Sequence, residues 1–198
     1  LLGLFKYGRG TAPPMVKESI LEQKEGEYDK KIIAIYPGRF QPMGQHHAEV
    51  FFSLLDDQKY EKVFIATSNK VDMTDKDGTP KSPFDFSEKQ KIAAFYGIEP
   101  AQVVMTNNPY YAKEITDNFD PEEYRVVYFV GDKDMRENPR FQKTSGTTKE
   151  GYDWNIEVAP HIPIHIPKIG EMSGTSLRKA LKDADEKRFD EIMGDFNP

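Results

Sequence analysis

The sequence contains no cysteine among its 198 residues. This excludes disulfide bonds and thiolate metal sites, and it fits a reducing compartment such as the cytoplasm. No apolar run approaches the roughly 18–20 residues of a membrane-spanning helix, so no membrane partner is expected. The chain also lacks an excess of positive charge, because 33 acidic residues outnumber 27 basic ones and give a net charge of −6. Proteins that bind duplex nucleic acid more often carry a positive balance, so nucleic acid is not an expected partner.

Length and composition favour one α/β domain preceded by an arm. With 37% hydrophobic and 30% charged residues, the chain can bury a core and keep a charged surface. Residues 1–30 mix glycine, proline and charge without apolar periodicity, and we interpret them as an N-terminal arm or linker. Whether the arm is a disordered leader or binds a protein partner stays open, as does oligomerisation. Residues 31–198 form the expected domain, and the missing initial Met leads us to expect a portion of a longer product.

Short runs of β-branched and aromatic residues alternate with stretches of helical length. These runs are typical of buried parallel strands, and they cover residues 32–36, 63–67, 103–106 and 126–130. The segments between them predict helices over residues 48–58, 87–96 and 110–118, and residues 176–192 predict a final charged helix. The alternation predicts a parallel sheet with helices on both faces.

Three local patterns refine this prediction. Ser87 with Gln90 three residues later has the spacing of a capping box. Residues 136–160 are rich in Gly, Thr, Lys and Asn, which predicts a long loop. Residues 162–167 form an extended run interrupted by proline, which fits an edge strand at best.

The segment between the first strand and the first helix carries the first candidate site. In an open parallel sheet, ligands bind beyond the carboxyl ends of the strands. Gly38 would let the backbone approach a ligand closely, and Arg39 would supply positive charge. His46 and His47 follow at the start of the helix, where an adjacent pair has no evident packing role. The alternative is that both are solvated surface histidines.

A second candidate site lies near the other end of the chain, at Ser173, Gly174, Thr175 and Arg178. These residues lead into the last predicted helix, whose first N–H groups can bind an anion. The alternative is an ordinary Ser/Thr helix cap. Two strand-to-helix turns of this kind, one with histidines and one with an arginine, together predict a site for a nucleoside triphosphate.

Gly131, Asp132 and Asp134 form a third turn, directly after a predicted strand. A carboxylate there could hold a ribose, an acceptor or a hydrated Mg²⁺, and the alternative is a plain polar turn. The aspartates at positions 72, 75 and 77 lack the spacing of a calcium loop. No metal site built from protein ligands is therefore expected.

Several of these motifs together resemble the nucleotidylyltransferase superfamily. Residues 38–47 (GRFQPMGQHH) resemble its first motif, GRFQPxHxGH, and residues 173–178 (SGTSLR) resemble its last motif, SGTxxR. The stretch Ser82-Pro83-Phe84 with Glu88-Lys89, and the element at residues 106–109 (TNNP), are similar to archaeal-type nicotinamide mononucleotide adenylyltransferases. The chain departs from the first motif at Gly44, where the pattern has histidine, and at His46, where it has glycine.

The resemblance implies a Rossmann-like α/β/α sandwich and transfer of AMP or CMP from a triphosphate with Mg²⁺. It implies that His47 contacts the triphosphate, with His46 and Arg178 as further catalytic candidates. The nucleotide-binding candidates are Gly38, Arg39, Phe40, Gln41, Gly131, Asp132, Asp134, Ser173, Gly174 and Thr175.

The expected acceptor is a small phosphorylated molecule such as nicotinamide mononucleotide. The alternative is a nucleotide-binding module without turnover in a larger assembly, since divergent members of the superfamily also occur in tailed phages. A cytoplasmic location is expected, which is the host cytoplasm for a phage protein.

Overall fold

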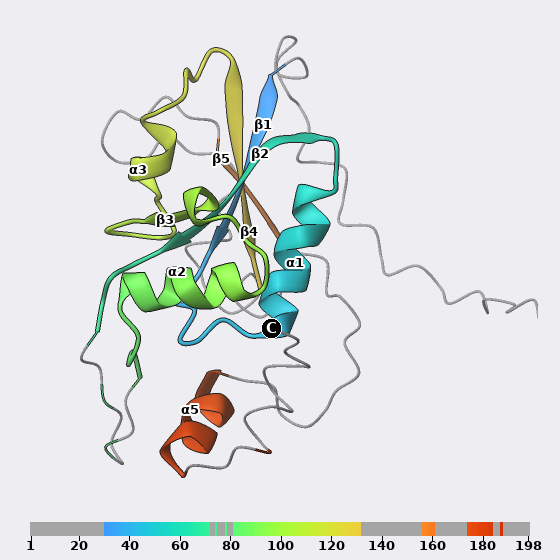
Figure 1. Ribbon diagram of the computed structural model, residues 1–198. Coiled ribbons are helices and arrows are strands. Elements are labelled where there is room, and N and C mark those ends of the chain that lie inside the picture. Colours follow the sequence, from blue (N-terminus) through green and yellow to red (C-terminus); the bar gives the residue numbers. More distant parts are fainter. Residues whose placement is uncertain are drawn as a thin grey trace, which may run out of the picture.

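A parallel sheet of five strands forms the centre of the computed structural model (Figure 1), which describes residues 30–71, 74, 78, 81–131, 156–160, 174–183 and 187. The strands are β1 (Lys31–Pro37), β2 (Tyr60–Thr67), β3 (Val103–Met105), β4 (Tyr124–Val130) and β5 (Ile156–Pro160). Their order is β3-β2-β1-β4-β5, and every neighbouring pair is parallel. All carboxyl ends therefore meet at one edge of the sheet. Strands β2 and β3 lie on one side of β1, and β4 and β5 lie on the other side, so the strand order reverses between β1 and β4.

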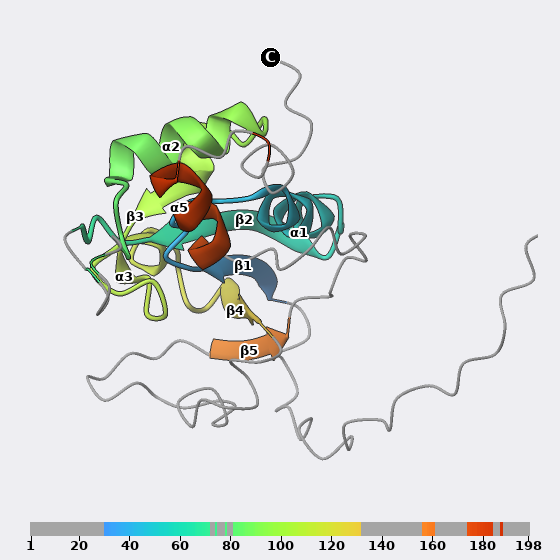
Figure 2. The same ribbon diagram turned by 90° about the horizontal axis from the view of Figure 1, so that it is seen from below.

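Helices cover both faces of this sheet, as predicted (Figure 2). The helices are α1 (Gln45–Leu55), α2 (Phe86–Phe95), α3 (Lys113–Thr116) and α5 (Gly174–Lys182), with the 3-10 turn η1 (Pro100–Gln102) before β3. One core cluster joins the sheet to α1 and α2, and a second joins it to α3. This confirms the predicted Rossmann-like α/β/α arrangement. Within the described residues, no helix is long and apolar enough to cross a membrane.

Strand β1 shows why its sequence is almost continuously apolar. Ile33 and Ile35 pack in the α3 cluster, whereas Ala34 and Tyr36 pack in the α1 and α2 cluster. Successive strand residues point to opposite faces, so a central strand covered on both faces buries residues of both sets, here from Ile33 to Pro37. The same strand thus fixes the start of the loop that follows Pro37.

The third helix is much shorter than predicted. It covers only Lys113–Thr116, whereas residues 110–118 had the length of a full helix. At its start, Tyr111 N–H donates to Asn108 O in a turn. At its end, Asn118 Nδ2 donates to Glu114 O at 2.8 Å and to Ile115 O at 3.3 Å. These side-chain bonds occupy carbonyls that a continuing helix would use, which ends it early.

Helix α2 has a capping box, but the predicted pair of residues was wrong. Asp85 is the N-cap, and its Oδ1 accepts from Glu88 N at 2.9 Å while Glu88 Oε2 accepts from Asp85 N at 2.8 Å. Ser87 lies inside the helix, and Gln90 Nε2 donates to Pro100 O at 3.2 Å. Asp85 with Glu88 and Ser87 with Gln90 both have the spacing of a capping box. Asp85 forms the cap because the helix begins at the next residue, Phe86.

We expect Asp85→Ala to lower the free energy of unfolding by about 1 kcal/mol, because it removes the cap of α2. For a domain of this size, that loss lowers the melting temperature by about 2–4 °C. Ser87→Ala is the matched control and should change the melting temperature little. Thermal unfolding by circular dichroism measures both, and an equal loss for Ser87→Ala would contradict the assignment of the cap.

The edge of the sheet also differs from the prediction. The expected loop over residues 136–160 ends in strand β5, which pairs with β4 from Val126 opposite Ile156 to Val130 opposite Pro160. Its sequence, IEVAP, offers only a short alternation of apolar residues, so the strand signal is weak. The run at 162–167 lies outside the described residues, as do residues 1–29 of the predicted arm 1–30 and most of the predicted last helix beyond Asp183.

Candidate functional site

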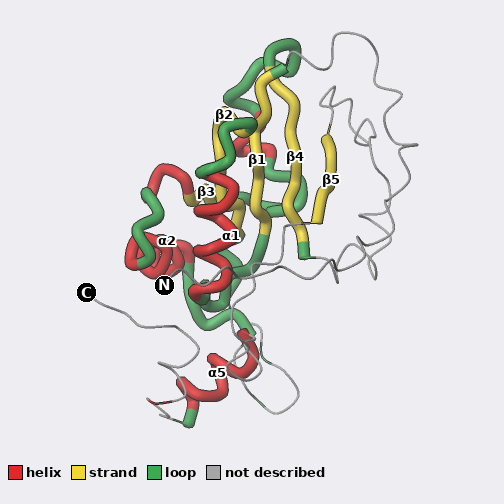
Figure 3. Tube along the Cα trace, turned by 90° about the vertical axis from the view of Figure 1, so that its right-hand side faces the viewer, coloured by secondary structure: helices red, strands yellow, loops and turns green. Residues whose placement is uncertain are grey.

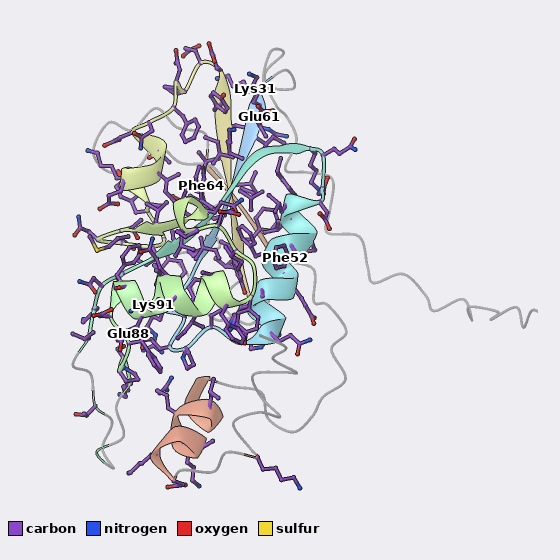
Figure 4. The ribbon with its side chains drawn as sticks, in the orientation of Figure 1. Lys31, Phe52, Glu61, Phe64, Glu88 and Lys91 are labelled. Atoms are coloured by element: carbon purple, nitrogen blue, oxygen red, sulfur yellow. The ribbon has the colours of Figure 1, made fainter. Side chains whose placement is uncertain are left out.

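The loop that follows β1 lies at the edge where the strand order reverses, the usual place for a ligand in such sheets. Figure 3 shows α5 beyond this same edge, on the side where α1 begins. A hydrogen bond from Arg178 on α5 to Gln41 brings the last candidate segment to the loop after β1. The amino edge, marked by Lys31 and Glu61 in Figure 4, is at the far end of the sheet.

Gly38 and Phe40 give the loop its shape. Gly38 N–H donates to Ala66 O at 3.0 Å, which holds the loop to β2. Phe40 has a φ of +45°, and its buried ring packs edge-on against Tyr36 at 5.3 Å between centroids. A Cβ at position 38 would lie 2.8 Å from this ring, so any larger residue would force the ring or the loop to shift. Arg39, between them, is exposed at the edge of the sheet.

Gln41 braces the loop against the segment before α2. Its Nε2 donates to Phe84 O at 2.7 Å, and its Oε1 accepts from Phe84 N at 2.9 Å. The side chain is buried, and both the oxygen and the nitrogen of its amide group have a backbone hydrogen-bond partner, as a buried amide requires. This contact gives a structural purpose to the Pro83-Phe84 stretch that the sequence singled out. Binding of a nucleotide by Gln41 remains a prediction.

The two histidines lie together at the start of α1. Gly44 is the N-cap, and its N–H donates to His47 Nδ1 at 3.0 Å. Since Nδ1 accepts this bond, the proton of the neutral ring is on Nε2, which makes Nε2 a donor. The ring of His46 lies 3.8 Å from that of His47, centroid to centroid, and Phe40 packs edge-on against His47 at 5.4 Å. Both histidines are half-buried, so the alternative of fully solvated surface residues does not hold.

Arg178 joins the last motif to the first. It lies on α5 with only 9% of its surface exposed, and its Nη1 donates to Gln41 O at 2.8 Å. Leu177 beside it is also buried, whereas Lys179 is exposed. Of the remaining predicted residues, Gly174 and Thr175 begin α5, and Gly131 follows β4 at the same edge. Ser173, Asp132 and Asp134 lie outside the described residues.

The element at residues 106–109 also reaches this edge. Thr106 N–H donates to Thr67 O at 2.8 Å, which places it beside the end of β2. Glu114 Oε1 holds Asn107 by accepting from its backbone N at 2.9 Å and its Nδ2 at 2.7 Å.

Burial and the nearby Tyr110 raise the pKa of the Tyr36 hydroxyl, which therefore stays protonated at neutral pH.

Lys89, which the sequence singled out only as part of the motif with Glu88, lies beside the loop after β1. Only 3% of its surface is exposed, and its Nζ donates to Thr67 Oγ1 at 3.4 Å and to Ser68 O at the end of β2. Burial, together with repulsion from Arg39 and despite attraction from Asp85, lowers the pKa of Lys89 to about 8. Lys89 lies one turn before Ala93, the other buried residue of α2, on the face of the helix that packs inward.

Comparisons with known proteins give likenesses of fold at low identity. No protein-family model and no curated protein sequence matches the chain. Among solved structures, Plasmodium falciparum nicotinic acid mononucleotide adenylyltransferase complexed with NaAD is 14% identical with a TM-score of 0.45, covering 84% of this chain and 98% of its own. The same enzyme complexed with APC is 15% identical with a TM-score of 0.46 and the same coverage.

A bifunctional NMN adenylyltransferase/ADP ribose pyrophosphatase from Francisella tularensis, complexed with AMP and a manganese ion, is 14% identical with a TM-score of 0.37. That likeness covers 83% of this chain and 52% of the Francisella protein. The strand order and the geometry of the loops therefore carry the functional interpretation of this chain.

Proposed function

We propose that this protein is a nucleotidyltransferase. In this reaction, a phosphate oxygen of the acceptor forms a bond to the α-phosphorus of a nucleoside triphosphate. The bond from that phosphorus to the oxygen bridging the α- and β-phosphates breaks, and pyrophosphate leaves. We propose ATP as the donor and nicotinamide mononucleotide as the acceptor, with CTP as the second donor to test. These preferences come from the sequence motifs.

The hydrogen bond between Arg178 and Gln41 is the observation that carries this proposal. It connects residues 137 positions apart, one from each sequence motif, at the carboxyl edge of the sheet. A guanidinium held there places positive charge beside the loop that also carries Arg39 and the His47 imidazole. Two motifs that separately resemble phosphate-binding turns thus supply one site, as a triphosphate requires.

The residues of the site would act by positioning and by electrostatic stabilisation, which dominate phosphoryl-type transfers. The Nε2–H of His47, whose orientation is fixed through Nδ1, would donate to a phosphate oxygen. Arg178 and Arg39 would balance charge on the phosphates, and the exclusion of water by Phe40 would strengthen these interactions. No covalent intermediate with the protein is needed.

Mg²⁺ is the cation expected to arrive with the nucleotide. Within the described residues, no group of three histidine and carboxylate side chains could hold a metal ion. Mg²⁺ needs few protein ligands when substrate phosphates bind it, and it keeps several of its waters. When bound in this way, Mg²⁺ would neutralise charge on the phosphate oxygens.

The test is to incubate the protein with Mg²⁺, each of ATP and CTP, and a panel of phosphate-bearing acceptors that includes nicotinamide mononucleotide. Pyrophosphate release that depends on the acceptor supports the proposal and identifies the acceptor. Calorimetric titration with each triphosphate accompanies the assay. A protein that neither binds a triphosphate nor releases pyrophosphate would refute it.

A second candidate function is nucleotide binding without turnover, within a larger assembly. Gly44 favours it, because the family motif that the chain resembles has a histidine at this position and glycine offers no side-chain donor. Triphosphate binding without pyrophosphate release for any acceptor would establish this function in place of the first.

Arg178→Ala should weaken triphosphate binding more than monophosphate binding. A charge-assisted hydrogen bond from a guanidinium to a terminal phosphate is worth about 1.5–3 kcal/mol. Arg178→Lys should restore only part of the affinity, since the forked donor pair is lost. Isothermal titration with ATP and AMP measures the difference, and equal losses for the two nucleotides would place the role of Arg178 in the shape of the loop alone.

A further inference from the structure

Within the described residues, the buried ammonium of Lys89 forms no ion pair with a carboxylate, although Asp85 attracts its charge. The partners of Lys89 Nζ are two neutral oxygens, Thr67 Oγ1 and Ser68 O. A buried charge is costly unless an opposite charge balances it. A negative charge added near the ammonium of Lys89 would therefore stabilise its charged form.

The position of Lys89 shows where that counter-charge would bind. Its Nζ donates to Thr67 Oγ1 at 3.4 Å, and the same hydroxyl donates to Arg39 O at 3.3 Å. The ammonium is thus connected through one hydroxyl to the backbone of the loop after β1. Thr67 is fully buried at the end of β2, so this connection has a fixed geometry.

We propose that Lys89 is a positioning residue that holds the loop after β1 through Thr67, and that the phosphates of a bound nucleotide supply a counter-charge to this buried ammonium. The proposal rests on the proposed function, because it assigns the same loop as the phosphate site. It adds a coupling of nucleotide affinity to the charge of one lysine.

The sign of this coupling follows from the charges around Lys89. In the protein without nucleotide, burial and Arg39 on the loop after β1 lower the pKa of Lys89 to about 8, while Asp85 at the N-cap of α2 opposes the shift. Bound phosphates favour the charged form and raise this pKa. Nucleotide binding therefore takes up a proton above pH 8, and the affinity falls as the pH rises.

The test compares wild type with Lys89→Met by isothermal titration with Mg²⁺ and ATP, Mg²⁺ and CTP, and AMP. We expect wild type to bind ATP about tenfold more tightly than Lys89→Met at pH 7, since charge-assisted contacts are of this size. A tenfold gap corresponds to a rise of about one unit in the pKa of Lys89 on binding. The two proteins should therefore converge in affinity above about pH 9.

Proton uptake gives a readout that a purely structural lysine would not produce. Titration at pH 8.5 in two buffers of different ionisation enthalpy should show uptake of about half a proton per ATP bound by wild type and none by Lys89→Met. At this pH the phosphates, whose second pKa lies near 6, stay fully ionised and contribute nothing. Lys91→Met is the matched control, because Lys91 lies on the same helix and is exposed (Figure 4). It should match wild type in affinity and uptake.

Thr67→Val tests the connection to the loop. It removes the hydroxyl between Lys89 and Arg39 O while keeping the size of the side chain, and we expect weaker ATP binding with proton uptake retained. Unchanged affinity would overturn the positioning role. ATP binding by wild type with no uptake at pH 8.5 would overturn the counter-charge. These results are distinct from a failure of the proposed function, in which wild type binds no triphosphate at all. Uptake by wild type alone decides the question if Lys89→Met does not fold.

Discussion

Replacing Gly38 by alanine should abolish most of the triphosphate affinity of the protein. The added Cβ would lie 2.8 Å from the ring of Phe40, closer than two carbon atoms can approach. Phe40 cannot swing away easily, because it is buried and packs edge-on against Tyr36 and His47. The loop must therefore shift as a whole, at a cost of about 1–3 kcal/mol. Isothermal titration with ATP and thermal unfolding measure the two consequences.

A double-mutant cycle with Phe40→Ala separates this clash from any other effect of the methyl group. Without the ring, Gly38→Ala should cost little further affinity. Gly97→Ala is the control for a strained glycine remote from the site. Gly97 has a φ of +84° at the end of α2, so alanine there should lower the melting temperature and leave ATP affinity unchanged. A loss of affinity in Gly97→Ala as large as in Gly38→Ala would show that binding follows general stability.

The parallel sheet could be predicted from the sequence because its central strands are buried on both faces. Residues 32–36 and 126–130 are continuous apolar runs, and they became the centres of β1 and β4. Strand β5 was missed, because five residues of weak alternation at an edge carry little signal. The third helix was predicted too long. Its end is set by a local hydrogen bond from the Asn118 side chain to Glu114 O, which competes with the backbone hydrogen bonds of a longer helix.

The site could be predicted as a set of motifs, but its internal connections could not. The distance of 2.8 Å between Arg178 Nη1 and Gln41 O depends on how α5 packs against the sheet edge. The burial of Lys89 depends on which face of α2 meets β2, and a weakly amphipathic helix does not reveal that face. Likewise, the role of His47 Nδ1 as an acceptor for Gly44 N–H becomes visible only in the folded helix.

The largest kinetic effects are expected from His47, whose two nitrogens can be tested separately. Nδ1 accepts from Gly44 N–H and caps α1, whereas Nε2 carries the proton that would reach a phosphate oxygen. His47→Asn keeps an acceptor near the position of Nδ1 and removes the Nε2 donor. His47→Gln keeps a donor near the position of Nε2 and removes the local cap. We therefore expect Asn to preserve stability and to lower kcat by about 10²–10³, and Gln to lower stability while keeping more of the turnover.

We expect His46 to replace the histidine that the nucleotidylyltransferase motif, which this loop resembles, has at the position of Gly44. The rings of His46 and His47 lie 3.8 Å apart, centroid to centroid, so both imidazoles are close together at the start of α1. We expect His46→Ala to lower acceptor-dependent pyrophosphate release about as much as His47→Asn, by about 10²–10³, with little change in melting temperature. Gly44 has an extended backbone, with a φ of −113°, so the double variant Gly44→His, His46→Gly can adopt the family pattern. A mild effect of His46→Ala together with faster turnover in the double variant would show that His46 does not compensate. If neither His46→Ala nor His47→Asn changes turnover or triphosphate affinity, the loop after β1 is not the phosphate site and the proposed function is wrong.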